Sequence, residues 1–353
     1  MLALALLLVA SCASPPQRAS TTSPPPASPS QATGAAASPT QSAPPSTVTL
    51  SLSCRLPIAW DTYTSQGALR KFGFLKFPQE TVNEDPSAPA GSVFYDRAYA
   101  RWLPVRREAV SNDGRRYAYT TGSAYQNTPG TVHVVDLASG ADRAVYSGNT
   151  VFRVVSFAPE GIYLTLQAPE GRSHGLWIQD PAGGAARLIN PDVVDPWVAA
   201  GVGWGVEFDT SDPSPAPGGI EGPVNRLVRI DLQTGGTTSW FTWLGADIFL
   251  DGVDYSANPF VGVSRPTPSD PGTETEEFWF ITGKGSGRRL FAGPIDHPWP
   301  MRLGAIENHG AWFQSGYGQT SPSTVWLYSG AAIRVAATVN LDSVTVAGGC
   351  IDT

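Results

Sequence analysis

A short phrase recurs along the chain and constrains its fold more than any other feature. An apolar strand of about five residues is followed by a turn rich in Gly, Ser or Ala and then by another short strand. The copies begin at Val132, Leu176, Leu227, Phe278 and Val325, with a weaker copy at Val93, so that successive starts lie 39 to 51 residues apart. A strand repeat of this length predicts an all-β fold built from repeated four-stranded sheets.

A second strand–turn–strand phrase precedes each copy, as in Ala109–Tyr119 and Val154–Leu164. Each places a Gly just before a β-rich run, as a hairpin requires. The stretch Ser111-Asn112-Asp113-Gly114, which leads into a β-rich run, resembles the TolB-type, WD40-like propeller repeat, in which a Ser-Pro-Asp-Gly turn leads into the second strand. Only the copy at residues 109–140 matches closely. The resemblance implies a propeller architecture over about residues 50–350 and implies no function.

We therefore predict a single β-propeller over residues 48–353, with six four-stranded blades and seven as the alternative. The predicted blades cover residues 50–105, 106–147, 150–190, 196–243, 246–292 and 298–338, the first of them irregular. A further strand, Ser343–Ala347, is predicted to pair with the N-terminal blade and close the ring. The chain contains 37 Gly and 32 Pro, a density that argues against long helices because both residues break them.

Cys54 and Cys350 lie at the two ends of the predicted ring. Closure of the ring would bring these ends together, and an exported protein tolerates a disulfide. We therefore predict a Cys54–Cys350 disulfide, with two separate buried thiols as the alternative.

The apolar run Leu2–Ala10 is too short to span a bilayer and matches the core of a secretory signal peptide. It ends in Val9-Ala10-Ser11-Cys12, which resembles a bacterial lipobox and implies that Cys12 carries lipid. No Lys or Arg precedes the run, and a plain cleaved signal or a chance apolar terminus are the alternatives. Residues 1–11 are thus predicted to be a signal peptide. Residues 12–47, rich in Pro, Ser, Thr and Ala, are predicted to be a disordered tether.

The formal net charge of −7 argues against broad attraction to nucleic acid or to acidic lipid. The lipobox predicts an extracytoplasmic protein of the cell envelope, held at the membrane by its N-terminal lipid. The expected partner is an unknown envelope protein or polymer.

The longest connections are expected on one face of the disc, because in a repeated blade the second-to-third strand loops and the blade-to-blade loops emerge together. Trp197 and Trp299 are expected in two blade-to-blade loops, in Asp195-Pro196-Trp197 and His297-Pro298-Trp299-Pro300. Exposed aromatic rings there would anchor a partner. We predict a binding site that contains Trp197, Trp299, Asp195 and His297, with rings packed on a neighbouring blade as the alternative.

The other tryptophans recur at matching repeat positions, which indicates packing between blades: Trp177, Trp279 and Trp326 in one strand, and Trp204 and Trp312 in another. No nucleophile elbow, zinc-protease motif, Walker loop or dinucleotide-binding glycine motif occurs. The acidic clusters around Asp209–Glu221 and Asp270–Glu277 have no calcium-loop spacing and are expected to be solvated. We expect no metal, no cofactor and no catalytic residue.

These features predict a non-catalytic propeller that binds a protein, peptide or envelope polymer through its long-loop face. The alternative is a propeller enzyme, a glycoside hydrolase or lyase, that uses carboxylates at the mouth of the channel. One sequence does not pair those carboxylates in space.

Overall fold

Antiparallel pairing between neighbouring segments builds the sheets of this protein. The computed structural model describes residues 51–168, 172–209, 224–267, 270–294, 302–315, 321–330 and 332–353. Cys12 and the predicted signal peptide, tether, His297 and Trp299 lie outside these residues. The described residues belong to one unit by their contacts, and no helix among them is long and apolar enough to cross a membrane.

The first sheet joins the two ends of the described chain. Its strand order is β24 (Asp342–Val346), β1 (Cys54–Thr64), β2 (Gly67–Lys76) and β3 (Thr81–Glu84). β24 pairs antiparallel with β1, with Ile58 opposite Val346, and the short strand β25 (Ile351–Asp352) also pairs with β1. The C-terminal strand thus lies beside the first strand of the N-terminal sheet, as the sequence predicted.

Beside these strands, the disulfide between Cys54 and Cys350 links positions 296 residues apart, with a Cα–Cα distance of 5.7 Å. Both cysteines are buried in one hydrophobic cluster with Leu56, Trp312 and Val344. The covalent link and the strand pairing therefore hold the same two ends.

A small hairpin and a three-stranded sheet follow. The hairpin consists of β4 (Phe94–Asp96) and β5 (Arg101–Leu103), and the sheet of β6 (Arg116–Ser123), β7 (Thr128–Asp136) and β8 (Asp142–Gly148). In place of a fourth strand, the chain forms a 3-10 turn, η1 (Arg107–Ala109), and a single bridge from Val110 to Tyr117. Part of the predicted blade 50–105 is therefore the separate β4–β5 hairpin.

The predicted blades 150–190 and 196–243 form one continuous sheet of seven strands. These are β9 (Phe152–Ala158), β10 (Gly161–Leu166), β11 (His174–Gln179), β12 (Arg187–Ala199), β13 (Val202–Phe208), β14 (Val224–Ile230) and β15 (Thr237–Thr242). β12 is the shared strand: its first half pairs with β11 and its second half with β13. The expected loop containing Trp197 is therefore a strand, because β12 passes from one sheet group to the next without a turn.

Two four-stranded sheets complete the fold. One contains β16 (Asp247–Val253), β17 (Pro259–Thr267), β18 (Asp270–Gly283) and β19 (Ser286–Pro294), and the other β20 (Arg302–Glu307), β21 (Gly310–Gln314), β22 (Ser323–Tyr328) and β23 (Ile333–Val339). β17 and β18 pair as far as Thr267 opposite Asp270. The acidic segment around Asp270–Glu277 therefore belongs largely to β18, which pairs with β17.

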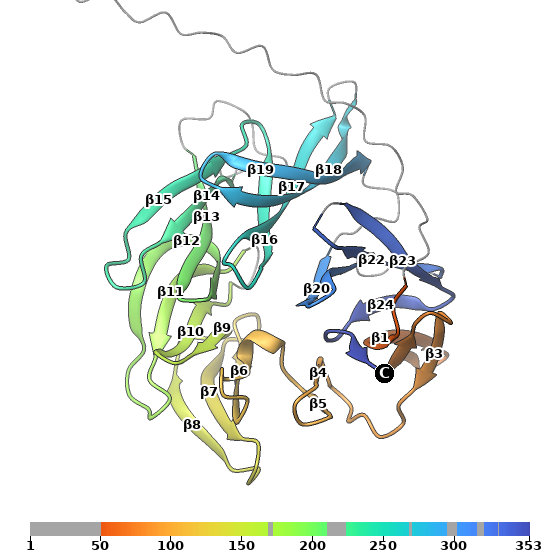
Figure 1. Cartoon of the computed structure of the whole chain (residues 1–353). Helices are drawn as coiled ribbons and strands as arrows, with labels where there is room; N and C mark the ends of the chain where they lie inside the picture. Colours follow the sequence, from red (N-terminus) through yellow and green to blue (C-terminus); the bar gives the residue numbers. More distant parts are fainter. Residues whose placement is uncertain are drawn as a thin grey trace, which may run out of the picture. The chain divides into compact units, whose positions relative to one another are not determined.

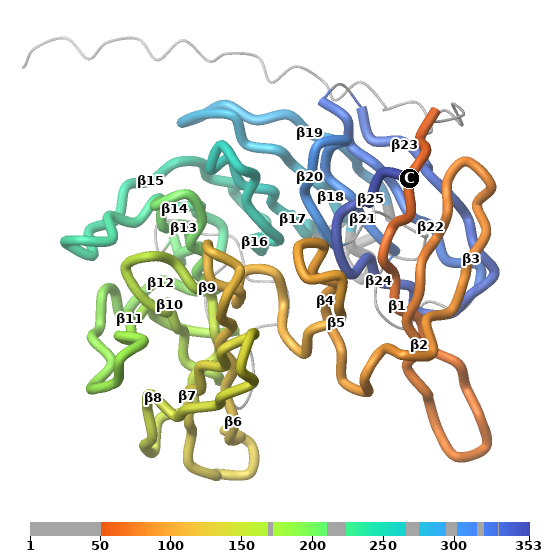
Figure 2. The backbone as a smooth tube through the Cα atoms, turned by 60° about the horizontal axis from the view of Figure 1, so that its bottom comes forward, coloured from red at the N-terminus to blue at the C-terminus, as the bar shows by residue number. Residues whose placement is uncertain are grey.

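The first strands of successive sheets face one another across a common centre (Figures 1 and 2). β9 contacts β12, β12 contacts β16, β16 contacts β20, and β20 contacts β24. The β4–β5 hairpin packs through Tyr95 and Trp102 on Phe72 and Phe74 of the first sheet. On its other side, Leu103 clusters with Val110 and Leu137 of the next group. This all-β arrangement of sheets around a centre is that of a β-propeller.

One turn device recurs between the last two strands of a sheet, at β7–β8 and at β14–β15. The Asp136 carboxylate accepts hydrogen bonds from the Ser139 N–H (2.8 Å) and hydroxyl (2.7 Å). Asp231 accepts from the Gln233 and Thr234 N–H groups (both 2.9 Å). Backbone hydrogen bonds hold the pKa of both carboxyls below the usual range. Because the Asp side chain accepts hydrogen bonds from the backbone two or three residues further on, it stabilises a short turn directly after these strands.

The core lies between the sheets. Val132 and Val134 of β7 pack on Phe157, Ile162 and Leu164 of the next sheet, as alternating apolar residues of a half-buried strand do. The expectation that repeated tryptophans pack between sheets is confirmed: Trp204, Trp312 and Trp326 are buried, and Trp177 and Trp279 are partly buried against core clusters.

Candidate functional site

A chain of three cavities occupies the centre of the fold. Their volumes are about 450, 310 and 230 Å³, and all three are lined by Glu108 and Trp197. The largest receives residues from the first sheet, the hairpin, η1, β12, β16 and the last sheet. Because segments far apart in the sequence line the same space, this central cavity is the strongest candidate for a binding site.

The segment Arg106–Glu108 reaches the cavity because of the 3-10 turn. Backbone hydrogen bonds from Ala109 N–H to Arg106 O and from Val110 N–H to Arg107 O close the turn, both at 3.1 Å. Ala109 and Val110 are buried and anchor the segment, whereas Arg106 and Arg107 are exposed and line the cavity. A local departure from the strand pattern thus places two cations at the centre of the protein.

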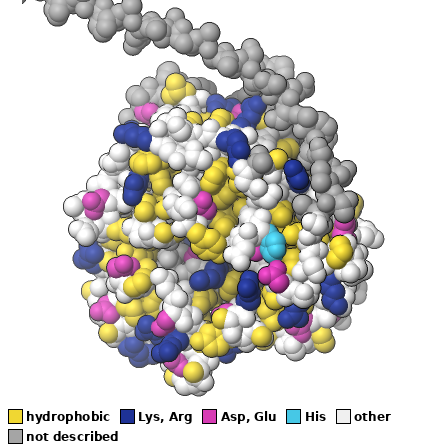
Figure 3. Space-filling view, viewed as in Figure 1, with side chains coloured by type: hydrophobic (Ala, Val, Ile, Leu, Met, Phe, Trp, Pro, Cys, Tyr) yellow, Lys and Arg dark blue, Asp and Glu magenta, His cyan; other side chains and the backbone are white. Residues whose placement is uncertain are grey.

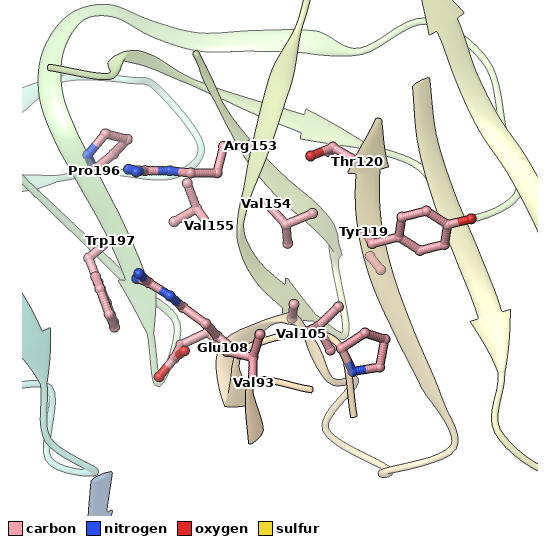
Figure 4. Close-up of a pocket in the computed structure, with 14 residues that line it drawn as sticks. Val93, Val105, Glu108, Tyr119, Thr120, Arg153, Val154, Val155, Pro196 and Trp197 are labelled. Carbon is pink, nitrogen blue, oxygen red and sulfur yellow. The ribbon is translucent and has the colours of Figure 1, made fainter. Parts of the chain in front are cut away.

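Arginines from other elements face the same space. Arg153 of β9 lines the cavity of about 310 Å³, and Arg302 of β20 lines the one of about 450 Å³. Figure 4 shows Arg153 and Trp197 directed into one space, with Glu108 at its lower edge. The space-filling view from the side of Figure 1 shows basic side chains beside hydrophobic ones near the middle of that face (Figure 3).

Burial lowers the pKa of Arg153, the charge of Asp195 opposes that shift, and the like charge of Arg106 adds to it. Asp251 of β16 is the second carboxylate of the cavity. Burial raises the pKa of Asp251 to about 6, although the Leu303 N–H donates to it and Arg302 and Arg106 favour its ionised form. Near neutral pH, the largest cavity is therefore lined by more positively charged than negatively charged side chains.

Of the four predicted binding residues, the structure places Trp197 on the wall of the cavities, whereas Asp195 does not line them. Trp197 lies on the cavity wall, partly buried against the cluster around Trp204 and Val206. Asp195 holds neighbouring segments together: it accepts from the Ser173 N–H (3.3 Å) and lies 3.7 Å from Arg172. Trp299 and His297 lie outside the described residues.

Asp195 has an unusual backbone conformation, with φ of 44°. Positive φ is uncommon for a residue other than glycine, although aspartate tolerates it better than most. Asp195 lies where the pairing of β12 shifts between Val194 and Trp197. Asp195 contacts Arg172, and Arg172 also reaches Asp247 at 2.9 Å. These contacts stabilise the irregular part of β12 and thereby fix the position of Trp197, two residues further along the strand.

Reasoning from the sequence missed Arg106, Arg107, Arg153, Arg302 and Asp251 as site residues. A signal for Asp251 exists: it is a carboxylate inside the apolar run Ile248–Val253, at the place of a first strand. Among the described residues, no group of three or more His, Cys, Asp or Glu side chains could hold a metal ion.

The sheets and their central cavity define the class of this protein as a β-propeller. No protein-family model matches the sequence, and the search of curated proteins found no relative.

The structure is similar to several solved structures at low identity. TolB from Acinetobacter baumannii is 10% identical over 83% of this chain and 67% of its own, with a TM-score of 0.45. A putative 6-phosphogluconolactonase from Bacteroides fragilis is 12% identical over 85% and 98%, with a TM-score of 0.47. An oligogalacturonate lyase from Vibrio parahaemolyticus is 8% identical over 70% of each chain, with a TM-score of 0.38.

Proposed function

We propose that this chain is a lipid-anchored, extracytoplasmic propeller that binds a protein, peptide or envelope polymer without catalysing a reaction. In this proposal the ring has six four-stranded blades and is closed by β24 on β1. Residues 1–11 act as the signal, Cys12 carries the lipid, and residues 12–47 form the tether. Residues 48–353 form the propeller that the tether holds away from the membrane.

The observation that carries the binding proposal is the central cavity lined from every part of the fold. Its wall offers an indole and several guanidinium groups, which are the side chains most enriched where partners are held tightly. The Cys54–Cys350 disulfide supports an extracytoplasmic location, since such bonds persist in oxidising compartments.

A photo-crosslinking experiment in living cells tests the binding proposal. Val93 is 44% exposed and lines the cavities, so benzoylphenylalanine at this position of the full chain is expected to form a discrete adduct. The same amino acid at Thr238, exposed on the outer strand β15, is the matched control and is expected to form none. Equal adducts from both positions, or adducts from Thr238 alone, would overturn the choice of site.

A second variant asks whether Trp197 anchors the partner. Loss of an anchoring indole typically costs about 2 kcal/mol, or roughly 30-fold in affinity, so Trp197→Ala is expected to remove most of the Val93 adduct. Trp240→Ala is the control, because Trp240 packs on the same cluster through Trp204, at a centroid distance of 5.3 Å, but does not line the cavities.

A second candidate function is hydrolysis or elimination on a glycan. The observation that favours it is that Glu108 and Asp251 line the same two cavities. Burial raises the pKa of Asp251 to about 6, which suits a general acid near neutral pH.

An activity assay separates this candidate from simple binding. Under the enzyme hypothesis, sugar products released from envelope glycans are expected to fall at least 100-fold in both Glu108→Gln and Asp251→Asn, as measured by chromatography. The exposed carboxylate Asp192 supplies the control, Asp192→Asn, which should retain activity. Product release that survives both cavity substitutions would place the chemistry elsewhere.

A further inference from the structure

Four arginines of the central cavities differ from most others in the described chain in having no hydrogen-bonded or ion-paired partner. Arg70, which also lines the largest cavity, pairs with Asp61 at 3.0 Å. Elsewhere, Arg226 pairs with Glu207 at 2.8 Å and Arg265 with Glu277 at 3.4 Å. In the part of the chain that the structure describes, no hydrogen bond or ion pair engages the guanidinium of Arg106, Arg107, Arg153 or Arg302. Four positive charges that make no hydrogen bond or ion pair within the described chain therefore line the adjoining central cavities.

Bringing these charges together carries a free-energy cost. Burial lowers the pKa of Arg153, and the like charge of Arg106 contributes to that shift. The chain as a whole has a net charge of −7, so carboxylates are available in the composition to neutralise the site. Among the described residues, however, the three central cavities are lined by only three carboxylates, Glu108, Asp251 and Glu307. The site is positively charged in a negatively charged protein, and its guanidinium N–H groups have no acceptor in the described chain. Such a site suits a negatively charged ligand.

The elements that carry the arginines also suit such a ligand. Arg153 lies on β9 and Arg302 on β20, both of them first strands of sheets, and Arg106 directly precedes the anchored turn η1. Donors on regular elements are held in place before the ligand arrives, which reduces the entropy lost on binding. The cavities of about 450 and 310 Å³ are within the range that small ligands or the end of a chain occupy.

We infer that the adjoining cavities of about 450 and 310 Å³, which share Arg106 and Trp197, together hold a ligand with at least two oxyanion groups, carboxylate or phosphate, between the guanidinium groups of Arg106, Arg153 and Arg302. A guanidinium presents paired N–H donors that match the two oxygens of either group. The indole of Trp197 forms the adjoining wall and contacts the uncharged part of the ligand. This inference rests on the proposed binding function of the same cavity. The oxyanions belong either to a free small molecule or to a group carried by the envelope partner.

Calorimetric titration of the full-length protein with pyrophosphate and with citrate tests the free form. Both ions are expected to bind and acetate is not, because a single carboxylate engages only one guanidinium. Each of Arg106→Gln, Arg153→Gln and Arg302→Gln is expected to weaken binding by about 10- to 100-fold, the usual range for a charged hydrogen bond. Arg187→Gln, at an exposed and likewise unpaired arginine away from the cavity, should leave binding unchanged.

Crosslinking from position 93 in the same variants tests the partner-borne form. If free anions do not bind but the adduct is lost in Arg106→Gln and Arg153→Gln and kept in Arg187→Gln, the oxyanions belong to the partner. If free anions do not bind and the adduct persists in all variants, the oxyanion inference is wrong while the binding function stands. If the wild-type chain forms no adduct at all, the binding function itself fails, whatever the titrations show. Circular dichroism of each variant verifies that the fold is retained.

Discussion

Replacement of both Cys54 and Cys350 by serine is expected to lower the free energy of unfolding by up to about 5–6 kcal/mol. The disulfide closes a loop with a sequence separation of 296, and in the chain-entropy relation a loop of this length gives that upper value. The double substitution avoids a free thiol, and urea unfolding of the variant and of the wild-type protein measures the difference.

The reduced wild-type protein serves as the control, because it should unfold at the same urea concentration as the double variant. A loss below about 1 kcal/mol would mean that strand pairing alone holds the ends together. That pairing includes Ile58 opposite Val346 in β1 and β24, and Arg55 opposite Ile351 in β1 and β25. A large loss would instead assign most of the closure to the covalent link.

Asp251→Asn is expected to stabilise the protein by about 3 kcal/mol at pH 8, because the charged form of Asp251 is disfavoured in the folded state. Burial raises the pKa of this carboxyl from 3.8 to about 6. The folded protein therefore binds the proton more tightly than the unfolded chain does. Below about pH 4 the proton is bound in both states and no cost arises, whereas between pH 4 and pH 6 the wild-type protein loses stability as pH rises.

Thermal unfolding of both proteins between pH 4 and pH 8 measures this effect. The two stabilities should converge near pH 4 and separate as pH rises, reaching a constant difference above pH 6. Asp192→Asn, at an exposed carboxylate, should show no such separation. A wild-type protein at least as stable as Asp251→Asn at pH 8 would mean that Arg106, Arg302 and the Leu303 N–H stabilise the carboxylate more than burial disfavours it.

The local parts of the fold follow from the sequence because they depend on local chemistry. The turn at Ser111–Gly114 is an example: the Ser111 hydroxyl donates to Asp113 at 2.6 Å, and the Arg116 N–H donates to Ser111 at 3.0 Å. Because the Ser111 hydroxyl bonds only to residues within five positions of it, the turn depends on no residue far away in the sequence. The same holds for strands such as β7, whose alternating valines identify the face that must be buried.

The prediction for Trp197 shows where a repeat pattern is insufficient. A regular blade boundary places a loop near residue 196, yet β12 runs as one strand from Arg187 to Ala199. The shifts in its pairing at Asn190 and after Val194 let one strand serve both sheet groups. Such shifts depend on hydrogen bonds to two different neighbours, which residue types alone do not encode.

By itself, the sequence determined that this chain would form short antiparallel sheets, that its two ends would meet, and that two cysteines lay where they could join those ends. Repetition, alternation and turn chemistry are properties of neighbouring residues, so they can be read along the chain. Only the tertiary structure decided that Arg106, Arg153, Asp251 and Arg302 line two adjoining cavities. These residues come from separate elements, and the way the sheets face a common centre, rather than any spacing in the sequence, brings their charges together.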